Sequence, residues 1–301
     1  MRTYVIASNE HHLTFESWFR RRLAAMIDGT ASAALAGGRF ALNGRPLVDS
    51  RTVLKAGDVL VDAEGDDRAV PDVASLSIVY EDADLIIVDK PAGMLSHPEK
   101  GMKEPDVLTA LATIRDATGC APGNRLDFNT SGLLIVTRSA AAAAILSAAT
   151  HADRIAKRYL AAASGYLAEP EAVVSAWLLK DDDRAVVRVA DVPIPGSKPI
   201  RTFYRVLAEQ RGISLLEVEP LTGRTHQIRA HLAFIGHPVV GDPLYGNAAV
   251  NRRFGLKRQA LCSRSLAFSF PEADHPWHRL DGRTFVKKDV EFLDPLGFRL
   301  S

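Results

Sequence analysis

The sequence predicts an α+β fold, with a large domain built on a mixed, largely antiparallel sheet and a small α+β domain before it. Short strand-like runs recur through residues 157–218 with few helices between them. Strands and helices do not alternate regularly, as they would in a doubly wound parallel sheet. An acidic stretch without periodicity over residues 63–76 indicates a linker. We therefore divide the chain into a small domain (1–62), the linker (63–76) and a large domain (77–301).

Composition places the chain among ordinary globular proteins. Hydrophobic residues make up 47% of the 301 residues and charged residues 24%. No run of about 18 apolar residues occurs, and the polar first 14 residues lack the apolar core of a signal peptide. The two cysteines, Cys120 and Cys262, suggest neither a disulfide framework nor a zinc site. We expect a cytoplasmic protein with no membrane span.

The net charge of +1 is not that of a protein held on nucleic acid by bulk charge. Any nucleic-acid binding must therefore come from a local basic patch.

In the small domain, aromatic and aliphatic residues recur at helical spacing from Phe15 to Met26, and a second short helix is predicted at Thr30–Ala36. Asn43-Gly44 indicates a hairpin, followed by a strand at Val59–Val61. This order resembles the small RNA-binding domain named after the fourth ribosomal small-subunit protein. In that family the second helix begins with basic residues, whereas here it begins with Thr, Ala and Ser. The arginines of this domain therefore suit either RNA contacts or a solvated surface equally well: Arg20, Arg21, Arg22, Arg39 and Arg45.

The large domain opens with Leu85–Asp89, an apolar run that predicts a strand buried on both faces. Lys90 ends this strand, where its ammonium either contacts a substrate phosphate or extends along the sheet edge to water. We expect a helix over 106–117 and an Ala-rich helix after Ser139 as its N-cap. The remaining strand-like runs are 157–166, 172–177, 185–189, 202–207 and 215–218.

Between the two predicted helices, Asp127 stands before the polar turn 129–132, and the apolar strand 133–136 follows at once. Thr130 and Ser131 can bond their hydroxyls to nearby backbone and define this turn. A carboxylate here is held rigidly and still reaches solvent, as catalytic residues on loops do. Aspartate is also ordinary in turns, so this window alone leaves open whether Asp127 only bonds its own backbone.

A helix is predicted from Thr225, its plausible N-cap, to Gly236. Its apolar stripe leaves Arg229 pointing elsewhere, within the first turn or so. A rigid turn at 241–246 follows. Farther along the chain lies a basic cluster of Arg252, Arg253, Lys257 and Arg258.

The sequence lacks the motifs of several other kinds of functional site. His226 and His231 lie five residues apart, on different faces of the predicted helix, so we expect structural histidines here, with His237, rather than a metal site. No Gly-rich phosphate loop and no dinucleotide motif occur, so no nucleotide cofactor is expected. Asp127 has no carboxylate partner of the kind glycoside hydrolysis requires. An aspartate that an arginine keeps ionised is suited to act as a nucleophile.

Four stretches together carry a resemblance to a known family. They are Asp89–Gly93, Gly123–Gly132, Lys157–Leu160 and Thr222–Gly246. In this order they resemble the RluA-type pseudouridine synthases over about residues 77–271. The resemblance implies a pseudouridine synthase fold with a central cleft, a monomer, no cofactor or metal, and structured RNA as substrate. Large-subunit ribosomal RNA is the expected target, with transfer RNA, or a non-catalytic RNA-binding role, as alternatives.

The resemblance also implies roles for single residues. Asp127 is the catalytic aspartate, Arg229 keeps it ionised, and Tyr159 stacks on the flipped base and helps remove the proton on carbon 5. Arg125 fills the gap left by the extruded base or orients the RNA backbone. Asn124 departs from the family, which usually has His there. The remaining expected substrate-binding residues are Lys90, Thr130, Arg224, His226 and Gln227.

Overall fold

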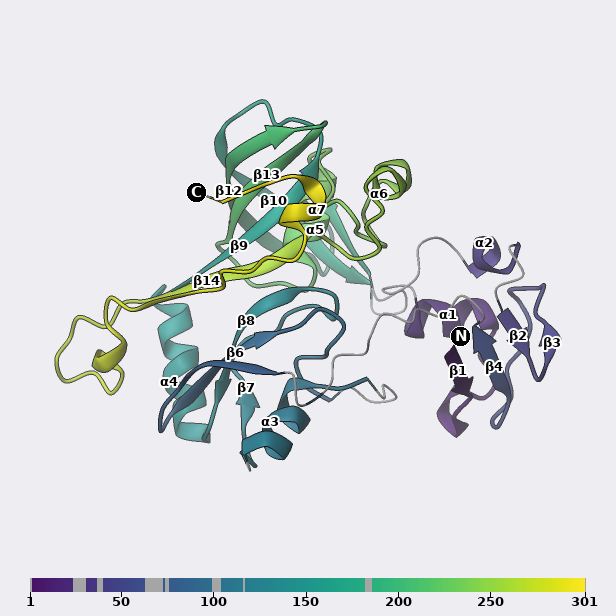
Figure 1. The fold of residues 1–301 in the computed structure, drawn as a ribbon, viewed down its shortest axis with the longest axis horizontal. Helices are drawn as coiled ribbons and strands as arrows, with labels where there is room; N and C mark the ends of the chain where they lie inside the picture. Colours follow the sequence, from purple (N-terminus) through teal and green to yellow (C-terminus); the bar gives the residue numbers. More distant parts are fainter. Residues whose placement is uncertain are drawn as a thin grey trace.

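The computed structural model describes residues 2–23, 31–36, 40–62, 73, 76–98, 104–115, 117–181 and 186–300, in a small N-terminal sheet domain and a large sheet domain (Figure 1). The small domain contains, in chain order, β1 (Arg2–Val5), the 3-10 helix η1 (Ser8–Glu10), α1 (Phe15–Arg22), α2 (Ala31–Ala36), β2 (Phe40–Leu42), β3 (Arg45–Pro46) and β4 (Val59–Asp62). Its strands are ordered β1-β4-β2-β3. Strand β1 was not expected from the sequence, because its residues, read alone, show no apolar alternation.

Helix α1 and the hairpin form as their residues predict. The Thr14 hydroxyl accepts a hydrogen bond from the Ser17 N–H and caps α1. Asn43 and Gly44 both have positive φ, as a two-residue hairpin turn between β2 and β3 requires. The apolar face of α1 packs on the sheet, where Trp18 and Phe19 are buried. The residues at 24–30 and 37–39, including Met26 and Arg39, lie outside the described part of the chain, as does most of the predicted linker.

The large domain is built on one mixed sheet. Its elements are β5 (Ser77–Glu81), β6 (Leu85–Lys90), α3 (Val107–Arg115), β7 (Ala121–Pro122), β8 (Ser131–Thr137), α4 (Ala140–His151), β9 (Ile155–Ser164), β10 (Glu171–Asp181), β11 (Val186–Ala190), β12 (Lys198–Gln210), β13 (Ile213–Pro220), α5 (Gln227–Phe234), α6 (Ala248–Phe254), β14 (Leu261–Phe268), η3 (His278–Leu280), β15 (Thr284–Val286) and α7 (Leu293–Leu296). The strand order is β11-β10-β12-β13-β9-β14-β8-β6-β5, with β15 beside β14 and β7 beside β8. The predicted mixed, largely antiparallel sheet is confirmed: in the described sheet only β8 and β14 pair in parallel.

Strands β6 and β8 are buried on both faces, which explains their continuous apolar runs. Alternate residues of the two strands enter two different cores. One core contains Ile86, Val88, Leu134 and Val136 with Leu111 of α3. The other contains Leu85, Ile87, Leu133 and Ile135 with Leu146 of α4. Helices α3 and α4 therefore cover opposite faces of this half of the sheet.

The pairing of β8 with β14 joins the two halves of the sheet. Gly132 lies here, inside β8 rather than in the turn where we expected it, with φ of 111°. A Cβ on Gly132 would lie 2.2 Å from the carbonyl oxygen of Ser263 in β14. Glycine thus permits both the backbone conformation and the close approach of the two strands.

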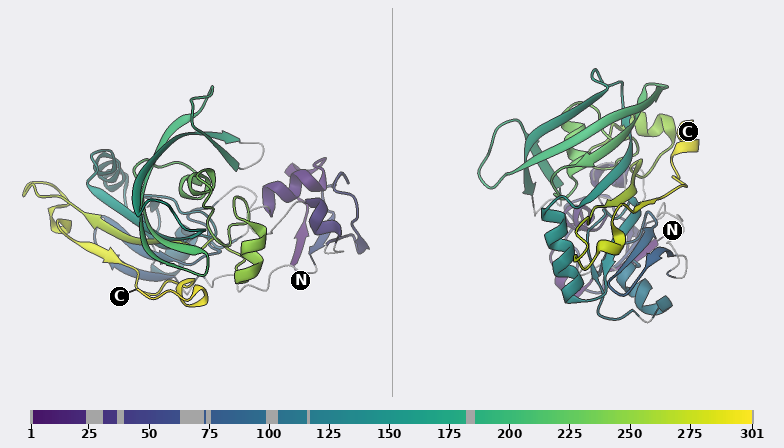
Figure 2. Two further views of the ribbon diagram at one scale, coloured as in Figure 1. Left: turned by 90° about the horizontal axis from the view of Figure 1, so that it is seen from above. Right: turned by 90° about the vertical axis from the view of Figure 1, so that its left-hand side faces the viewer.

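On the other half of the sheet, the long strands β10, β12 and β13 curve around α5 (Figure 2). Ala230 of α5 is buried against Ala176, Leu178 and Ile200 of β10 and β12. This packing fixes α5 relative to the sheet. Among the described helices, none is long and apolar enough to cross a membrane.

Candidate active site

Asp127 lies in the loop that leads into β8, and the backbone of this loop is fixed on both sides. Its carbonyl accepts the Thr130 N–H at 2.9 Å. The Ser96 hydroxyl both donates to the Leu126 carbonyl, at 2.9 Å, and accepts the Leu126 N–H, at 3.0 Å. The Asn124 side-chain oxygen accepts the Ile135 N–H at 2.8 Å. The Asp127 side chain remains 24% exposed, so a rigid loop presents a carboxylate that substrate can reach.

Lys90 binds the backbone of the same loop. Its side chain is fully buried, and Nζ donates to the carbonyls of Pro91 (3.1 Å), Met94 (2.8 Å) and Phe128 (3.2 Å). An ammonium group has three N–H donors, and here all three have acceptors. Burial lowers the pKa of Lys90 to about 7, although the nearby Asp127 charge opposes this shift. The expectation that Lys90 extends to water is therefore wrong: this lysine binds protein backbone.

Arg229 of α5 connects Asp127 to a second carboxylate. Its Nη1 donates to Asp127 Oδ2 at 2.8 Å, while Nε and Nη2 donate to Asp242 Oδ2 and Oδ1 at 2.6 and 2.9 Å. Arg229 is 2% exposed and the Asp242 side chain is fully buried. The bidentate contact with Asp242 sets the plane of the guanidinium, which leaves Nη1 directed at Asp127.

The turn at 241–246 holds Asp242 in place. Its Oδ1 also accepts the backbone N–H groups of Leu244 and Tyr245, at 2.8 and 3.1 Å. The side-chain oxygen of Asn251 accepts the Gly241 N–H at 2.6 Å. The rigidity expected of this turn thus comes from the same carboxylate that orients Arg229.

His226 precedes α5 in the left-handed conformation, with φ of 52°. Its Nε2 lies 4.0 Å from Asp127 Oδ2, and its Nδ1 lies 3.0 Å from the hydroxyl of Tyr245. That hydroxyl accepts the Val187 N–H at 2.9 Å, so its own proton is available for His226 Nδ1. The network therefore favours the tautomer with the imidazole proton on Nε2, the nitrogen that faces Asp127. Left-handed non-glycine residues of this kind concentrate at functional sites.

Helix α5 begins differently from the prediction. His226, not Thr225, occupies the N-cap position, and its side chain makes no capping hydrogen bond. Instead Gln227, which is 3% exposed, fixes the preceding loop: its Oε1 accepts the Thr222 hydroxyl and the Arg224 N–H, and its Nε2 donates to Thr202.

Two residues that we expected to contact substrate, Thr130 and Gln227, form hydrogen bonds within the protein. The amide of Gln227 is occupied by protein partners. Thr130 is 2% exposed, and its hydroxyl accepts a hydrogen bond from Gln259 Nε2 at 3.2 Å instead of bonding nearby backbone. The Ser131 hydroxyl likewise bonds Glu291, at 3.0 Å. Because Thr130 and Gln227 are buried, they position the two loops of the site rather than touch substrate.

Charges around Asp127 keep it ionised. Burial alone would raise the pKa of its carboxyl, but His226, Arg229 and Lys90 together hold that pKa below its usual range. Burial also lowers the pKa of His226, so this imidazole is largely neutral at neutral pH. Burial lowers the pKa of Arg229, but Asp242 and Asp127 raise it by more. Arg229 is therefore the positive charge beside Asp127 that persists. A carboxylate with this environment is suited to act as a nucleophile rather than as an acid.

Tyr159 of β9 is 8% exposed, and burial together with the Asp127 charge raises the pKa of its phenol well above the usual value. It therefore stays protonated at neutral pH. The structure leaves Arg125 and Arg224 exposed, each on a loop that leads into the site. The other two histidines bond within the protein: His231 Nδ1 lies 2.9 Å from the Thr202 hydroxyl, and His237 Nδ1 lies 3.0 Å from the Ser164 carbonyl. Among the described residues, no cluster of side chains suits a metal ion.

Sequence reasoning missed Asp242 and Tyr245 as members of this site. Both belong to the turn 241–246, whose residues we took only as a rigid turn. An aspartate and a tyrosine in a stretch that packs beside a buried arginine were the available signal. Arg258 also differs from the expected basic cluster of residues 252–258. It is partly buried and donates to the Ala92 carbonyl at 3.0 Å.

Comparison with known proteins identifies the family to which this site belongs. A family model described as RNA pseudouridylate synthase matches residues 84–234, which include Asp127, Tyr159 and Arg229. The chain is 31% identical over 276 residues to "Ribosomal large subunit pseudouridine synthase C" of Vibrio cholerae, covering 86% of each chain. It is 35% identical over 219 residues to "Ribosomal large subunit pseudouridine synthase D" of Nitrosomonas europaea, covering 70% of this chain and 62% of that relative.

Solved structures agree. "Human RNA Pseudouridylate Synthase Domain Containing 1" superposes with a TM-score of 0.59 at 27% identity, covering 73% of this chain and 85% of that one. The protein "Human RNA Pseudouridylate Synthase Domain Containing 4" shares the fold, with a TM-score of 0.58 at 21% identity over 74% of this chain and 94% of that one. The family match, the relatives and the shared fold confirm the resemblance seen in the sequence: this chain belongs to the RNA pseudouridylate synthase family, a family of isomerases.

Proposed function

We propose that this enzyme converts uridines of large-subunit ribosomal RNA to pseudouridine, with Asp127 as the nucleophile. The observation that carries this proposal is the buried Arg229, which binds Asp242 with two donors and donates from Nη1 to the partly exposed Asp127 at 2.8 Å. The names of the relatives, synthases of the ribosomal large subunit, support ribosomal RNA as the substrate. We place this activity in the cytoplasm.

The reaction is an isomerisation that Asp127 can begin in either of two ways. A carboxylate oxygen attacks carbon 1′ of the ribose as the glycosidic bond to N1 breaks, or it adds to the pyrimidine ring. The uracil then detaches, rotates and rejoins through carbon 5. Carbon 5 loses its proton and N1 gains one, so that atoms and electrons balance without a redox cofactor or a metal. Asp127 ends the cycle as a free carboxylate.

Arg229 suits such a cycle because two carboxylates, those of Asp127 and Asp242, balance its charge. While Asp127 is covalently bound, that residue carries no charge. A buried arginine would then lose its counterion, at a cost of several kcal/mol, if it had no other partner. Asp242 supplies that partner throughout, with contacts of 2.6 and 2.9 Å. Arg229 can therefore remain in place while Asp127 changes its charge.

Tyr159 supports the reaction as a platform for the base. A uridine inside a stem must leave its stack before a protein can reach carbon 1′, and an aromatic ring compensates for the lost stacking by about 1–3 kcal/mol. The raised pKa of Tyr159 disfavours the phenolate, so stacking is a better role for it than removal of a proton. To exposed Arg125, two residues before Asp127, we assign the role of filling the gap in the RNA or holding its backbone.

Pseudouridine mapping tests the function in cells. RNA from cells that lack the gene is compared with RNA from cells complemented by the wild type or by Asp127→Ala. We expect one or more large-subunit sites to vanish on deletion and to return only with the wild type. Sites that return with Asp127→Ala would contradict the nucleophile. An altered site in transfer RNA alone would replace the proposed substrate, and no altered site in any RNA would favour a non-catalytic RNA-binding role.

A further inference from the structure

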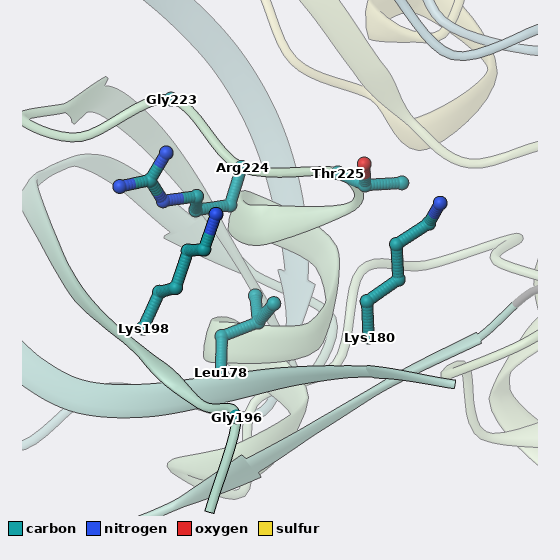
Figure 3. Close-up of a pocket in the computed structure, with 7 residues that line it drawn as sticks. All are labelled: Leu178, Lys180, Gly196, Lys198, Gly223, Arg224 and Thr225. Carbon is teal, nitrogen blue, oxygen red and sulfur yellow. The ribbon is translucent and has the colours of Figure 1, made fainter. Parts of the chain in front are cut away.

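A basic pocket is lined in part by Gly223–Thr225, the residues just before His226, and by none of the residues that hold Asp127. Figure 3 shows its lining side chains. Its volume is about 250 Å³, and it is bounded by the end of β10, the turn at Gly196, the start of β12 and the loop Gly223–Thr225. Three of its lining side chains are cations: Lys180, Lys198 and Arg224. None of its lining residues is acidic.

The sheet register explains why these cations meet. Leu178 of β10 pairs with Lys198 of β12, so their side chains share one face of the sheet. Farther along β12 the same face buries Ile200 and Thr202 toward α5. Lys180 follows Leu178 by two residues and lies on this face as well. The pocket is therefore the solvent-exposed continuation of the face that packs against α5.

The loop on the other side of the pocket leads to His226, which lies close to Asp127. Arg224 comes two residues before His226, whose Nε2 lies 4.0 Å from the Asp127 carboxylate. Gln227 fixes this loop to β12 through the hydrogen bond from the Arg224 N–H, at 3.2 Å, and the one to Thr202. These hydrogen bonds fix the position of the pocket relative to the Asp127 carboxylate.

The positive charges of the pocket favour the binding of an anion. In the described part of the chain, no carboxylate lies within salt-bridge distance of Lys198 or Arg224. In the view of Figure 3 their charged ends lie on one side of Leu178, and Lys180 lies on the other. Like charges held together repel each other, and an anion between them removes that cost. Gly223 leaves room for it, since a Cβ there would meet no atom within 4 Å.

We propose that this pocket binds a backbone phosphate of the RNA strand next to the target uridine, with Lys198 and Arg224 as direct contacts. Lys180 adds a third positive charge at the rim. This assignment rests on the proposed function and extends it, because it identifies β10 and β12 as a part of the enzyme that grips RNA without reading its sequence. Such contacts set the register of the strand, and their strength falls with salt.

The test compares Lys198→Gln with a matched control, Arg201→Gln. Arg201 lies three residues along β12 and is exposed on the opposite face of the sheet, so its replacement removes the same charge outside the pocket. Binding of a fluorescein-labelled short oligouridylate is measured by anisotropy between about 50 and 200 mM salt. We expect Lys198→Gln to weaken binding about threefold to tenfold and to reduce the slope of log Kd against log salt by roughly one, with no such change for Arg201→Gln.

Kinetics on unmodified large-subunit ribosomal RNA provide the second measurement. We expect Lys198→Gln to raise KM more than it lowers kcat, as the loss of a positioning contact does. Equal slopes and equal KM values for the two variants would overturn the pocket assignment. If wild-type protein forms no pseudouridine but the two binding slopes differ, the pocket stands and the proposed reaction fails. The two claims are thereby separated.

Discussion

Arg229 contacts two carboxylates that differ in burial, and this difference predicts the effect of changing each. Asp242 is fully buried and Asp127 is 24% exposed. We expect Asp242→Asn to destabilise the protein by about 3–5 kcal/mol, because it removes the buried counterion of a buried arginine. Urea unfolding measures this, with Glu171→Gln as control. That variant breaks an exposed pair with Arg205 and should cost less than about 1 kcal/mol. Similar losses for the two variants would contradict the role given to Asp242.

Tyr245 acts on the site through His226. We expect Tyr245→Phe to lower kcat by about tenfold or more, because His226 loses the partner that orients it, and the Val187 N–H loses its acceptor. The pH profile of kcat should change as well, since the variant alters the environment of the imidazole. Tyr166→Phe is the matched control: the hydroxyl of exposed Tyr166 also accepts a backbone N–H, from Gly212 at 3.0 Å, but none of the described hydrogen bonds joins it to His226. If both variants keep wild-type kcat and pH profile, Tyr245 is only structural.

Lys90 gives the protein a pH dependence of stability. Its pKa falls from 10.5 in the unfolded chain to about 7 in the folded protein. Between these values the unfolded chain carries a proton that the folded protein has released, so raising the pH stabilises the folded state through this group. We expect the stability of wild type minus that of Lys90→Met to rise by up to about 1.4 kcal/mol per pH unit between pH 7 and 9.5. Urea unfolding at several pH values measures this difference, and a constant difference would contradict the lowered pKa.

At the scale of elements, the junction of β8 and β14 holds the loop of Asp127 against the rest of the sheet. Gly132→Ala should destabilise the protein by several kcal/mol, because its Cβ would lie 2.2 Å from a backbone oxygen of β14 that cannot move aside. Gly119→Ala is the control: its φ of 77° is also positive, against 111° for Gly132, but a Cβ there would meet no atom within 4 Å, so it should cost only about 1 kcal/mol of backbone strain. Equal costs measured by thermal unfolding would mean that strain, and not close approach, explains Gly132.

The elements that the sequence predicted well are those with strong local signals. The apolar runs of β6 and β8, the Ser139 cap of α4 and the Asn43-Gly44 hairpin all lie where we expected them. The start of α5 was placed wrongly at Thr225, because propensity favours a Thr cap while the fixed geometry of the site holds His226 in a left-handed conformation. Strand β5 was missed because its residues are partly exposed and gain their order by pairing with β6.

At the scale of the whole molecule, the site depends on contacts that the sequence does not display. Asp127 and Arg229 lie 102 residues apart and meet only because α5 packs against the curved half of the sheet, on β10 to β13, while the loop of Asp127 leads into β8 in the other half. The family resemblance supplied both residues, but it gave no reason for Lys90, Thr130 and Gln227 to be buried. Their burial follows from partners distant in the sequence, the Phe128 carbonyl for Lys90, Gln259 for Thr130 and Thr202 for Gln227, which no local pattern encodes. The basic pocket also depends on a nonlocal arrangement, the pairing of β10 with β12 beside the loop Gly223–Thr225.

The account depends most on Asp127 as the nucleophile. The most direct measurement is the single-turnover rate of pseudouridine formation by purified wild type and Asp127→Asn on the RNA identified by mapping, with RNA binding measured in parallel. The asparagine keeps the size of the side chain and its contact with Arg229 but cannot form the covalent bond. We predict a loss of about 10⁴-fold or more in rate, with RNA affinity within about threefold of wild type. An Asp127→Asn enzyme that retains a tenth of the wild-type rate would contradict the account.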